Sequence, residues 1–203
     1  MVTGQTPGQD WQPAPLSEVA SLFSKTAAPW WIAGGHAIEL ATGRSFREHH
    51  DIDVLVLRRD QLAVQEVLAG WQWWAADPPG NLRPWRPGEM LPVGVHDVWC
   101  RPTASAPWRI QVMLDEAEGD EWVSRRDRHV RCGLTDLGAV SAAGIPYLRP
   151  EVQLYYKAKQ PRPRDAVDFA AVLPMLDAGQ RAWLVQSIGS TYGPHPWIEQ
   201  LGE

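Results

Sequence analysis

The sequence predicts an α+β fold, in which a mixed sheet with flanking helices is followed by a small C-terminal helical region. Two observations support this prediction. Up to about residue 114, short apolar runs bounded by glycine and proline alternate with amphipathic stretches, as strands and helices do. From Pro150 onward, the segments have the apolar spacing of helices. We therefore expect a flexible arm at 1–14, an α/β domain at 15–140 and a helical domain at 145–203.

In the first half, Ser17 can cap the first helix, and Gly34-Gly35 forms a tight turn from which the next helix begins directly. Prolines and glycines disfavour regular structure between residues 77 and 92, where we expect a long loop. The expected helices are 17–25, 36–41 and 60–68, and the expected strands are 30–33, 52–57, 70–75, 95–101 and 108–114, of which the last two form a hairpin.

In the second half, three helices follow one another. Pro150 begins a helix that runs through Lys159, because proline is well tolerated in the first turn. The prolines at 161 and 163 end it, and a second helix over 164–176 is expected to kink at Pro174. A third helix is expected over 179–188.

Composition and charge narrow the classes of partner. The chain has 203 residues, a net charge of -5 and a pI near 5.7, and it lacks the basic runs of a general nucleic-acid binder. We therefore expect a small molecule, rather than a nucleic acid, as the partner. The chain begins without a signal-peptide pattern and contains no run of about 18 apolar residues, so we expect a cytoplasmic protein without a membrane partner. The sequence does not indicate an oligomeric state.

Tryptophan and cysteine are both expected to be structural. Twelve tryptophans gather in clusters and beside prolines. Large rings fill a core or line a pocket, and core filling is favoured because the aromatics do not alternate with a basic stripe. Cys100 and Cys132 lie far apart without metal-ligand spacing, so buried free thiols are expected.

Two aspartates mark the candidate metal site. Asp51 and Asp53 are two residues apart on an apolar run, so they should point to the same face of one strand. Neighbouring carboxylates repel each other unless a cation lies between them, and a hard divalent ion prefers oxygen ligands. The pair therefore predicts a site for Mg²⁺.

A phosphate site is expected close by in the sequence. Gly34 and Gly35 let the backbone approach a ligand, and the amides at the start of the following helix attract anions. Magnesium held by one or two carboxylates usually completes its shell with water and substrate phosphate oxygens. A metal-nucleotide is therefore the expected ligand.

Together these residues resemble the polymerase-β-like nucleotidyltransferase superfamily, and within it the aminoglycoside 2''-adenylyltransferase-like branch. The first motif has the form GGxAI...GRxxRxHxDID, and the second is PEVQLYYKAKQPRPRDAVDF. The residues that match the first motif are Gly34, Gly35, Ala37, Ile38, Gly43, Arg44, Arg47, His49, Asp51, Ile52 and Asp53. The resemblance covers about residues 30–176. It implies a nucleotidyltransferase-like fold, with Asp51 and Asp53 holding metals and Gly34-Gly35 cradling the triphosphate of ATP.

Four further residues are candidates for binding the nucleotide. Arg44 and Arg47, in the loop before the aspartates, could neutralise phosphate charge, or they could belong to a solvated turn. His49 could orient the loop. Lys157 could reach the phosphates from its helix, whereas most helix lysines face water. Near it, Asp165 and Asp168 share a helix face, and we expect them to pair with Arg162 or Arg164 or to hold Lys157 in place.

One position departs from the family pattern. A third carboxylate usually stands on the neighbouring strand as the general base, but Gln111 occupies that place here and cannot accept a proton. Asp115 or Glu116 at the end of the strand could replace it, as could Asp97 on the partner strand. An acceptor that needs little base assistance is a further alternative. We prefer Asp97 and Asp115, although both could simply be exposed hairpin positions.

The sequence therefore predicts magnesium-dependent transfer of a nucleoside monophosphate from ATP to a hydroxyl of a small molecule. An aminoglycoside-type antibiotic is one such acceptor. The alternative is a catalytically weak or inactive nucleotide-binding module of the same fold, with a regulatory or antitoxin-like role. Gln111 supports this alternative, and the intact glycine pair and aspartate pair argue against it.

Overall fold

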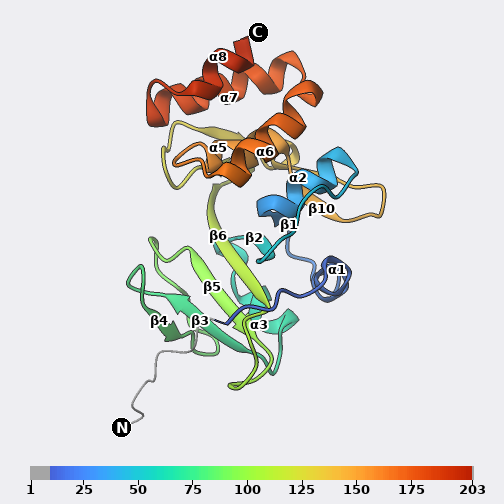
Figure 1. Cartoon of the computed structure of the whole chain (residues 1–203). Helices are drawn as coiled ribbons and strands as arrows, with labels where there is room; N and C mark the ends of the chain where they lie inside the picture. Colours follow the sequence, from blue (N-terminus) through green and yellow to red (C-terminus); the bar gives the residue numbers. More distant parts are fainter. Residues whose placement is uncertain (1–9, 203) are drawn as a thin grey trace. The chain divides into compact units, whose positions relative to one another are not determined.

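The computed structural model of the chain describes residues 10–202 and divides into two compact units (Figure 1). The first unit comprises the chain up to Trp31 together with Glu48–Glu116, and the second comprises Ile32–Arg47 together with Ala117–Glu203. Each unit therefore combines segments that are far apart in the sequence. The predicted domains at 15–140 and 145–203 remain predictions about which parts fold independently. Residues 1–9 of the expected arm lie outside the described residues.

The first unit is built on a sheet with the strand order β4-β3-β5-β6-β2. The β2 and β6 strands are parallel, and the other neighbours are antiparallel. The strands are β2 (Asp53–Leu57), β3 (Gln72–Ala76), β4 (Leu82–Pro84), β5 (Asp97–Arg101) and β6 (Ile110–Glu118), and the helices are α1 (Leu16–Phe23), α3 (Leu62–Val67) and the 3-10 turn η1 (Arg58–Asp60). Ahead of α1, the amides of Gln12 and Ala14 donate to the carbonyls of Trp108 and Arg109 at 3.0 and 2.9 Å.

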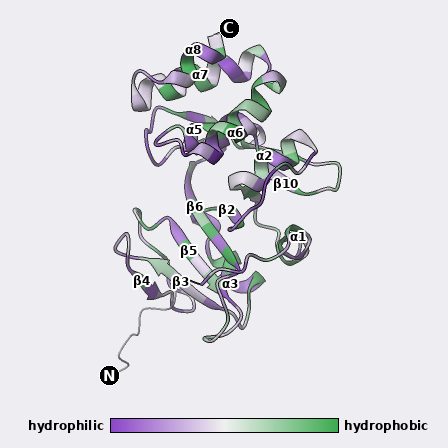
Figure 2. Cartoon of the chain, viewed as in Figure 1, coloured by the Kyte–Doolittle hydropathy of each residue, from purple (hydrophilic) through white to green (hydrophobic). Residues whose placement is uncertain are grey.

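Alternation along these strands separates a core face from a more open face. Side chains of the core face are almost completely buried: Val54, Val56, Ala75, Val98, Cys100, Ile110, Val112 and Leu114. On β5 and β6 the residues between them are partly exposed, as a two-residue period requires for a sheet with one covered face. Figure 2 shows that β6 becomes hydrophilic toward its C-terminal end, where the strand leaves the core of the first unit.

The second unit contains a smaller set of strands. The β1 strand ends in this unit and runs parallel to β10, with Ile32 opposite Tyr147, and β10 pairs antiparallel with β9. A further antiparallel pair joins β7 to β8, and β7 also pairs with β6. The elements are β1 (Trp30–Ala33), α2 (Gly34–Thr42), β7 (Glu121–Val123), β8 (Arg131–Gly133), α4 (Leu134–Leu137), β9 (Gly138–Val140) and β10 (Pro146–Leu148).

The C-terminal part of the chain consists of helices, of which α6 and α7 pack against α5 (Figure 1). They are α5 (Pro150–Lys157), α6 (Pro163–Val172), the 3-10 turn η2 (Leu173–Met175), α7 (Ala178–Tyr192) and α8 (Pro196–Gly202). Seven of the eight residues of α5 are buried, because α2, α6 and α7 pack around it. At the start of α7, Asp177 accepts the amide of Gln180 at 2.8 Å, which is a helix cap.

The predicted α+β class is confirmed, and several local expectations need correction. The expected loop at 77–92 contains the short strand β4, which pairs with β3. The expected helix at 164–176 ends at Val172 and continues as a 3-10 turn around Pro174. The sequence did not reveal the short elements between residues 121 and 148. No helix within residues 10–202 has the length and apolar character needed to cross a membrane.

Core filling is confirmed for half of the tryptophans. The six buried ones are Trp30, Trp31, Trp85, Trp108, Trp122 and Trp197. Among the partly exposed ones, Trp74 and Trp99 meet Trp108 edge to face, and Trp11 meets Trp99 in the same way. Cys100 is buried as expected, but Cys132 is only partly buried.

Candidate functional site

The predicted metal residues lie in the first unit, at the start of β2. Asp53 is the first residue of the strand, and both Asp51 and Asp53 are partly exposed while Ile52 between them is fully buried. The amide of Gln111 donates to the carbonyl of Ile52 at 3.0 Å, so the extended conformation already holds at this residue. Alternation then directs both carboxylates away from the core, and their oxygens suit a hard divalent cation.

The general-base candidates lie on the strands next to β2. Asp53 is opposite Gln111 on β6, which in turn is opposite Trp99 on β5. Directly opposite residues share a face, so Gln111 stands beside the metal residue, where a third carboxylate was expected. Its side-chain amide donates to Oδ1 of Asp97 at 3.1 Å. Asp97 therefore lies on the same face, one strand beyond Gln111.

Asp115 and Glu116 have different surroundings. Asp115 shares the face of Gln111 but stands four residues further along β6, about 13 Å away at the usual strand rise. It is only 1% exposed. Glu116 accepts a hydrogen bond from Nε of Arg58 at 2.5 Å, and the same guanidinium group also donates to the carbonyl of Pro92. Burial thus separates Asp115 from solvent, whereas Asp97 is partly exposed.

The glycine pair belongs to the second unit and opens α2. Gly34 has a φ of 66°, in the left-handed region that favours glycine, and it is the first helical residue. Its amide donates to Oε1 of Gln153 on α5 at 2.8 Å. The first amides of a helix have no acceptor within the helix, so this turn carries the positive end of the α2 dipole. Sequence reasoning missed Gln153, although it lies inside the second motif.

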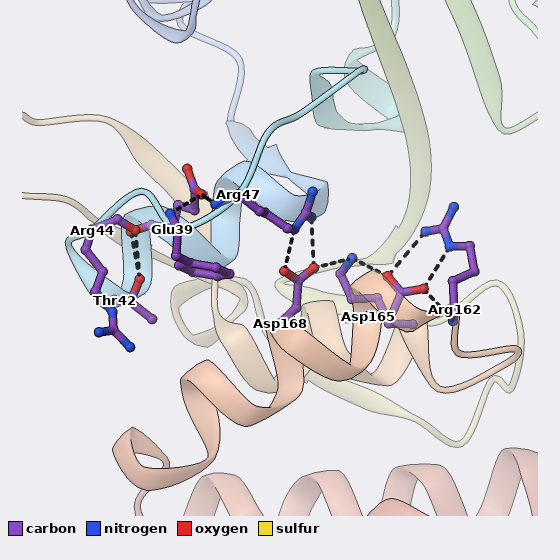
Figure 3. A network of polar contacts seen from close by, with 9 residues as sticks. Glu39, Thr42, Arg44, Arg47, Arg162, Asp165 and Asp168 are labelled. Atoms are coloured by element: carbon purple, nitrogen blue, oxygen red, sulfur yellow. Dashed lines mark hydrogen bonds and ion pairs between the residues drawn. The ribbon is translucent and has the colours of Figure 1, made fainter.

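A network of ion pairs joins the loop that follows α2 to α5 and α6 (Figure 3). The guanidinium group of Arg47 donates to both carboxylate oxygens of Asp168, at 2.8 and 2.9 Å. The ammonium group of Lys157 lies 2.9 Å from Asp168 and 2.7 Å from Asp165. Arg162 donates from Nε to Asp165 at 2.8 Å. Asp165 and Asp168 are 1% and 0% exposed.

This network gives Lys157 and Arg47 structural partners. The expectation that Asp165 and Asp168 hold Lys157 in place is confirmed, and both carboxylates bind it at once. Arg47 is fixed further, because Oε1 of Glu39 accepts its amide at 3.2 Å and the amide of Phe46 at 2.8 Å (Figure 3). Direct binding of phosphate by Lys157 or Arg47 remains a prediction.

Arg44 and His49 lie in the segment between α2 and β2. The side chain of Arg44 is exposed, and its carbonyl accepts the hydroxyl of Thr42 at 3.3 Å. His49 is partly buried in the segment that leads to Asp51. Their predicted roles toward the nucleotide are not tested by these contacts.

Electrostatics in the network favour the charged form of Asp165. Burial alone would raise the pKa of this carboxyl, but hydrogen bonds from Arg162 and Lys157 outweigh burial and hold the pKa well below its usual range. The thiols behave differently, because burial raises the pKa of Cys132 to about 12 and that of Cys100 further still. Both cysteines are therefore protonated at neutral pH and poorly nucleophilic.

A sequence model of the family described as aminoglycoside-2''-adenylyltransferase matches residues 15–172. Both motifs named above fall within this range. No curated protein sequence matches the chain.

Three solved structures are similar to the chain. The lincomycin-bound lincosamide antibiotic adenylyltransferase LnuA has a TM-score of 0.56 and 15% identity, over 81% of this chain and 100% of that chain. ANT(2'')-Ia in complex with adenylyl-2''-tobramycin has a TM-score of 0.51 and 13% identity, over 86% and 95%. The solution structure of ANT(2'')-Ia, an antibiotic-resistance factor, has a TM-score of 0.56 and 14% identity, over 87% and 90%. These similarities confirm the predicted nucleotidyltransferase-like fold.

The buried network yields a stability prediction. We expect Asp168→Ala to lower the free energy of unfolding by about 3–5 kcal/mol, because it leaves the charges of Arg47 and Lys157 buried without their shared partner. Urea denaturation followed by circular dichroism measures the change. Glu121→Ala removes an exposed ion pair with Arg131 and is the matched control, with an expected loss below about 1 kcal/mol. Equal losses in the two variants would contradict a stabilising role for the network.

Asp165 yields a prediction of pH dependence. Its pKa is lower in the folded chain than in the unfolded chain, so folding favours the ionised form. The resulting stability is complete above the unfolded pKa, about 3.9, and is lost progressively as the pH falls below that value. We expect Asp165→Asn to reduce the difference in unfolding free energy between pH 6 and pH 3. An unchanged difference would show that the ion pairs of Asp165 do not favour its ionised form.

Proposed function

The chain belongs to the aminoglycoside-2''-adenylyltransferase family, and from this premise we propose that it transfers a nucleoside monophosphate from magnesium-bound ATP to a hydroxyl of a small molecule. The observation that carries the proposal is the pair of partly exposed carboxylates, Asp51 and Asp53, on either side of the buried Ile52 where β2 begins. Without a cation, two neighbouring negative charges on one strand only cost stability. Binding of a metal ion would offset this repulsion and explain why two carboxylates lie so close together.

In this proposal, Asp51 and Asp53 bind the metal, and the Gly34-Gly35 turn binds the triphosphate. Bound magnesium would neutralise charge on the phosphates and align the reacting groups. The turn contributes the first amides of α2, and Gln153 supports it by accepting the Gly34 amide. We also propose that Arg44, whose side chain is exposed, contacts a phosphate directly.

Arg47, His49 and Lys157 have a supporting role in the proposal. The bidentate pair of Arg47 with Asp168 fixes the end of the loop that begins after α2. Lys157 keeps Asp168 and Asp165 together on α6, so it supports the same loop indirectly. His49 lies two residues before Asp51 and would influence the path of the chain into the metal pair.

We propose Asp97 as the general base. The acceptor hydroxyl would lose its proton to Asp97 as its oxygen attacks the α-phosphate, and pyrophosphate would leave on the opposite side. The hydrogen bond from Gln111 supports this role, because it orients the carboxylate of Asp97 on the face that carries Asp53. The burial of Asp115 makes it the weaker candidate.

An antibiotic is the acceptor class we propose. The similar structures contain lincomycin and adenylyl-2''-tobramycin, so two chemically different antibiotics occur on this fold. The second candidate function is nucleotide binding without efficient transfer, in a regulatory or antitoxin-like module, and it is favoured by Gln111 at the position of the third carboxylate. Binding and turnover must therefore be measured separately.

Calorimetry tests the prediction of nucleotide binding. Calorimetric titration with a nonhydrolysable ATP analogue should show binding that requires magnesium and that is lost in Asp51→Ala/Asp53→Ala, because no carboxylate remains to hold the metal. Asp120→Asn removes an exposed carboxylate outside the first unit and should bind as the unchanged chain does. Binding that is equal with and without magnesium would contradict the metal site, and absence of binding would contradict both candidate functions.

A variant of the proposed general base distinguishes nucleotidyl transfer from nucleotide binding. We expect Asp97→Asn to lower kcat about 10²- to 10⁴-fold, the usual contribution of a general base, while magnesium-dependent binding of the analogue stays intact. Asp115→Asn is the matched control and should change kcat far less. Release of pyrophosphate during acceptor screening provides the measurement. A larger loss in Asp115→Asn would assign the base to Asp115, and binding without turnover on any acceptor would favour the inactive module.

A further inference from the structure

The helix α2 begins without a side-chain cap of its own. Ala33 occupies the position before the helix, and its methyl group offers no oxygen to the first amides, so no cap hydrogen bond forms there. Serine, threonine, aspartate or asparagine usually fills this position and accepts an amide of the first turn. The start of α2 therefore has more donors than acceptors, and its first residue, Gly34, is partly exposed.

A side chain from α5 supplies one acceptor. Oε1 of Gln153 accepts the amide of Gly34 at 2.8 Å, and both residues belong to the second unit. Because a backbone N–H can only donate, this hydrogen bond also fixes the orientation of the carboxamide. Its oxygen faces Gly34, and the nitrogen Nε2 is the end that remains.

The nitrogen end of Gln153 is a donor without an acceptor in the protein. None of the described residues accepts a hydrogen bond from Nε2, although the side chain is only 5% exposed and buried polar groups are normally paired. Nε2 is nevertheless not among the polar atoms that the fold seals from solvent without a partner. Its two N–H groups are therefore accessible to a ligand beside Gly34.

These donors select a ligand that is rich in acceptors. Nε2 of Gln153 can only donate, and so can the amides at the start of α2. The positive end of the α2 dipole adds to their attraction for negative charge. A cation would be repelled by these N–H groups, whereas the oxygens of a phosphate accept several hydrogen bonds at once.

A comparison with glutamate separates the two ends of Gln153. A carboxylate at this position would accept the amide of Gly34 equally well, and its negative charge would suit the start of a helix. Glutamate would lack the donor, and it would repel a phosphate at the place where Nε2 can bind one. The support of Gly34 thus uses only the oxygen, and the nitrogen is left for the ligand.

We propose that Gln153 is a phosphate-binding residue, in which Oε1 holds the amide of Gly34 and Nε2 donates a hydrogen bond to the triphosphate of the nucleotide. This inference rests on the proposed function, because it names a contact to the triphosphate which that function requires. The amide of Gly34 is occupied by Gln153, so the phosphate meets Nε2 where it would otherwise meet this amide. The glycine pair of the first motif therefore depends on a residue of the second motif.

Side-chain amide signals test the contact on the whole chain. The ¹H–¹⁵N signals of the Gln153 carboxamide are assigned by their absence in Gln153→Met. The probes are a nonhydrolysable ATP analogue with magnesium, inorganic tripolyphosphate with magnesium, and adenosine. The analogue and tripolyphosphate should shift these signals saturably, and adenosine should not. A shift with adenosine, or a shift with the analogue but none with tripolyphosphate, would place the contact away from the phosphates and overturn the proposal.

The variant Gln153→Glu separates the ligand contact from the support of Gly34. The free energy of unfolding and the amide signal of Gly34 should be retained, because glutamate still accepts this amide. Magnesium-dependent binding of the analogue should weaken by roughly 10- to 100-fold or more, the range for losing one hydrogen bond to a charged group. Gln200→Glu adds the same charge at an exposed position of α8 and is the matched control, with unchanged affinity. Equal affinity in Gln153→Glu and the unchanged chain would leave Gln153 a purely structural role and overturn the proposal.

Calorimetry on the unchanged chain distinguishes this inference from the function on which it rests. If the analogue binds with magnesium but the Gln153 signals stay in place, Gln153 does not bind phosphate while the proposed function stands. This comparison uses the unchanged chain, so it decides the proposal even where Gln153→Glu does not fold. If the analogue does not bind at all, the proposed function fails, and the triphosphate contact fails with it.

Discussion

The second unit depends on one buried carboxylate, Asp168, which joins two segments that are distant in the sequence. It accepts both hydrogen bonds of the Arg47 guanidinium and also contacts the ammonium group of Lys157. A fully buried carboxylate is stable only with such partners, so the three side chains fix one another. Arg47 is also the last residue of its segment before the chain passes into the first unit. The network therefore fixes the end of the loop that follows α2 within the second unit.

In the first unit, the register of strand pairing determines which side chains lie beside Asp53. The parallel pairing of β2 with β6 sets Gln111 beside Asp53, and the antiparallel pairing of β6 with β5 adds Trp99 and brings Asp97 onto the same face. A slip of one residue would turn every one of these side chains into the core, where Val54 and Val112 now lie. The buried valines thus position the polar site, because their burial is lost in any other register.

Sequence reasoning predicted what is local and missed what depends on pairing. The strand at 30–33 follows from short-range pattern, and the structure contains it. The helix after it begins at Gly34 itself rather than after a glycine turn, and β2 begins at Asp53, so Asp51 precedes the strand. The hydrogen bond between Gln111 and Asp97 could not be derived, because it requires the register of a hairpin whose connection has no defining turn motif. Lys157 was ambiguous for a different reason. Seven of the eight residues of α5 are buried, so its pattern did not distinguish a core lysine from one that faces water.

Because Gln111 is uncharged, the proposed metal ligands and the proposed general base can lie on different strands. A carboxylate at this position would add a third negative charge directly beside Asp53, and it would need the metal to offset the repulsion. An amide adds no charge, and as a donor it holds Asp97 one strand further away, at 3.1 Å from its nitrogen. The metal ligands and the proposed base then belong to different strands. In the proposed reaction, the acceptor hydroxyl would therefore lie over β6 and β5, between Asp53 and Asp97.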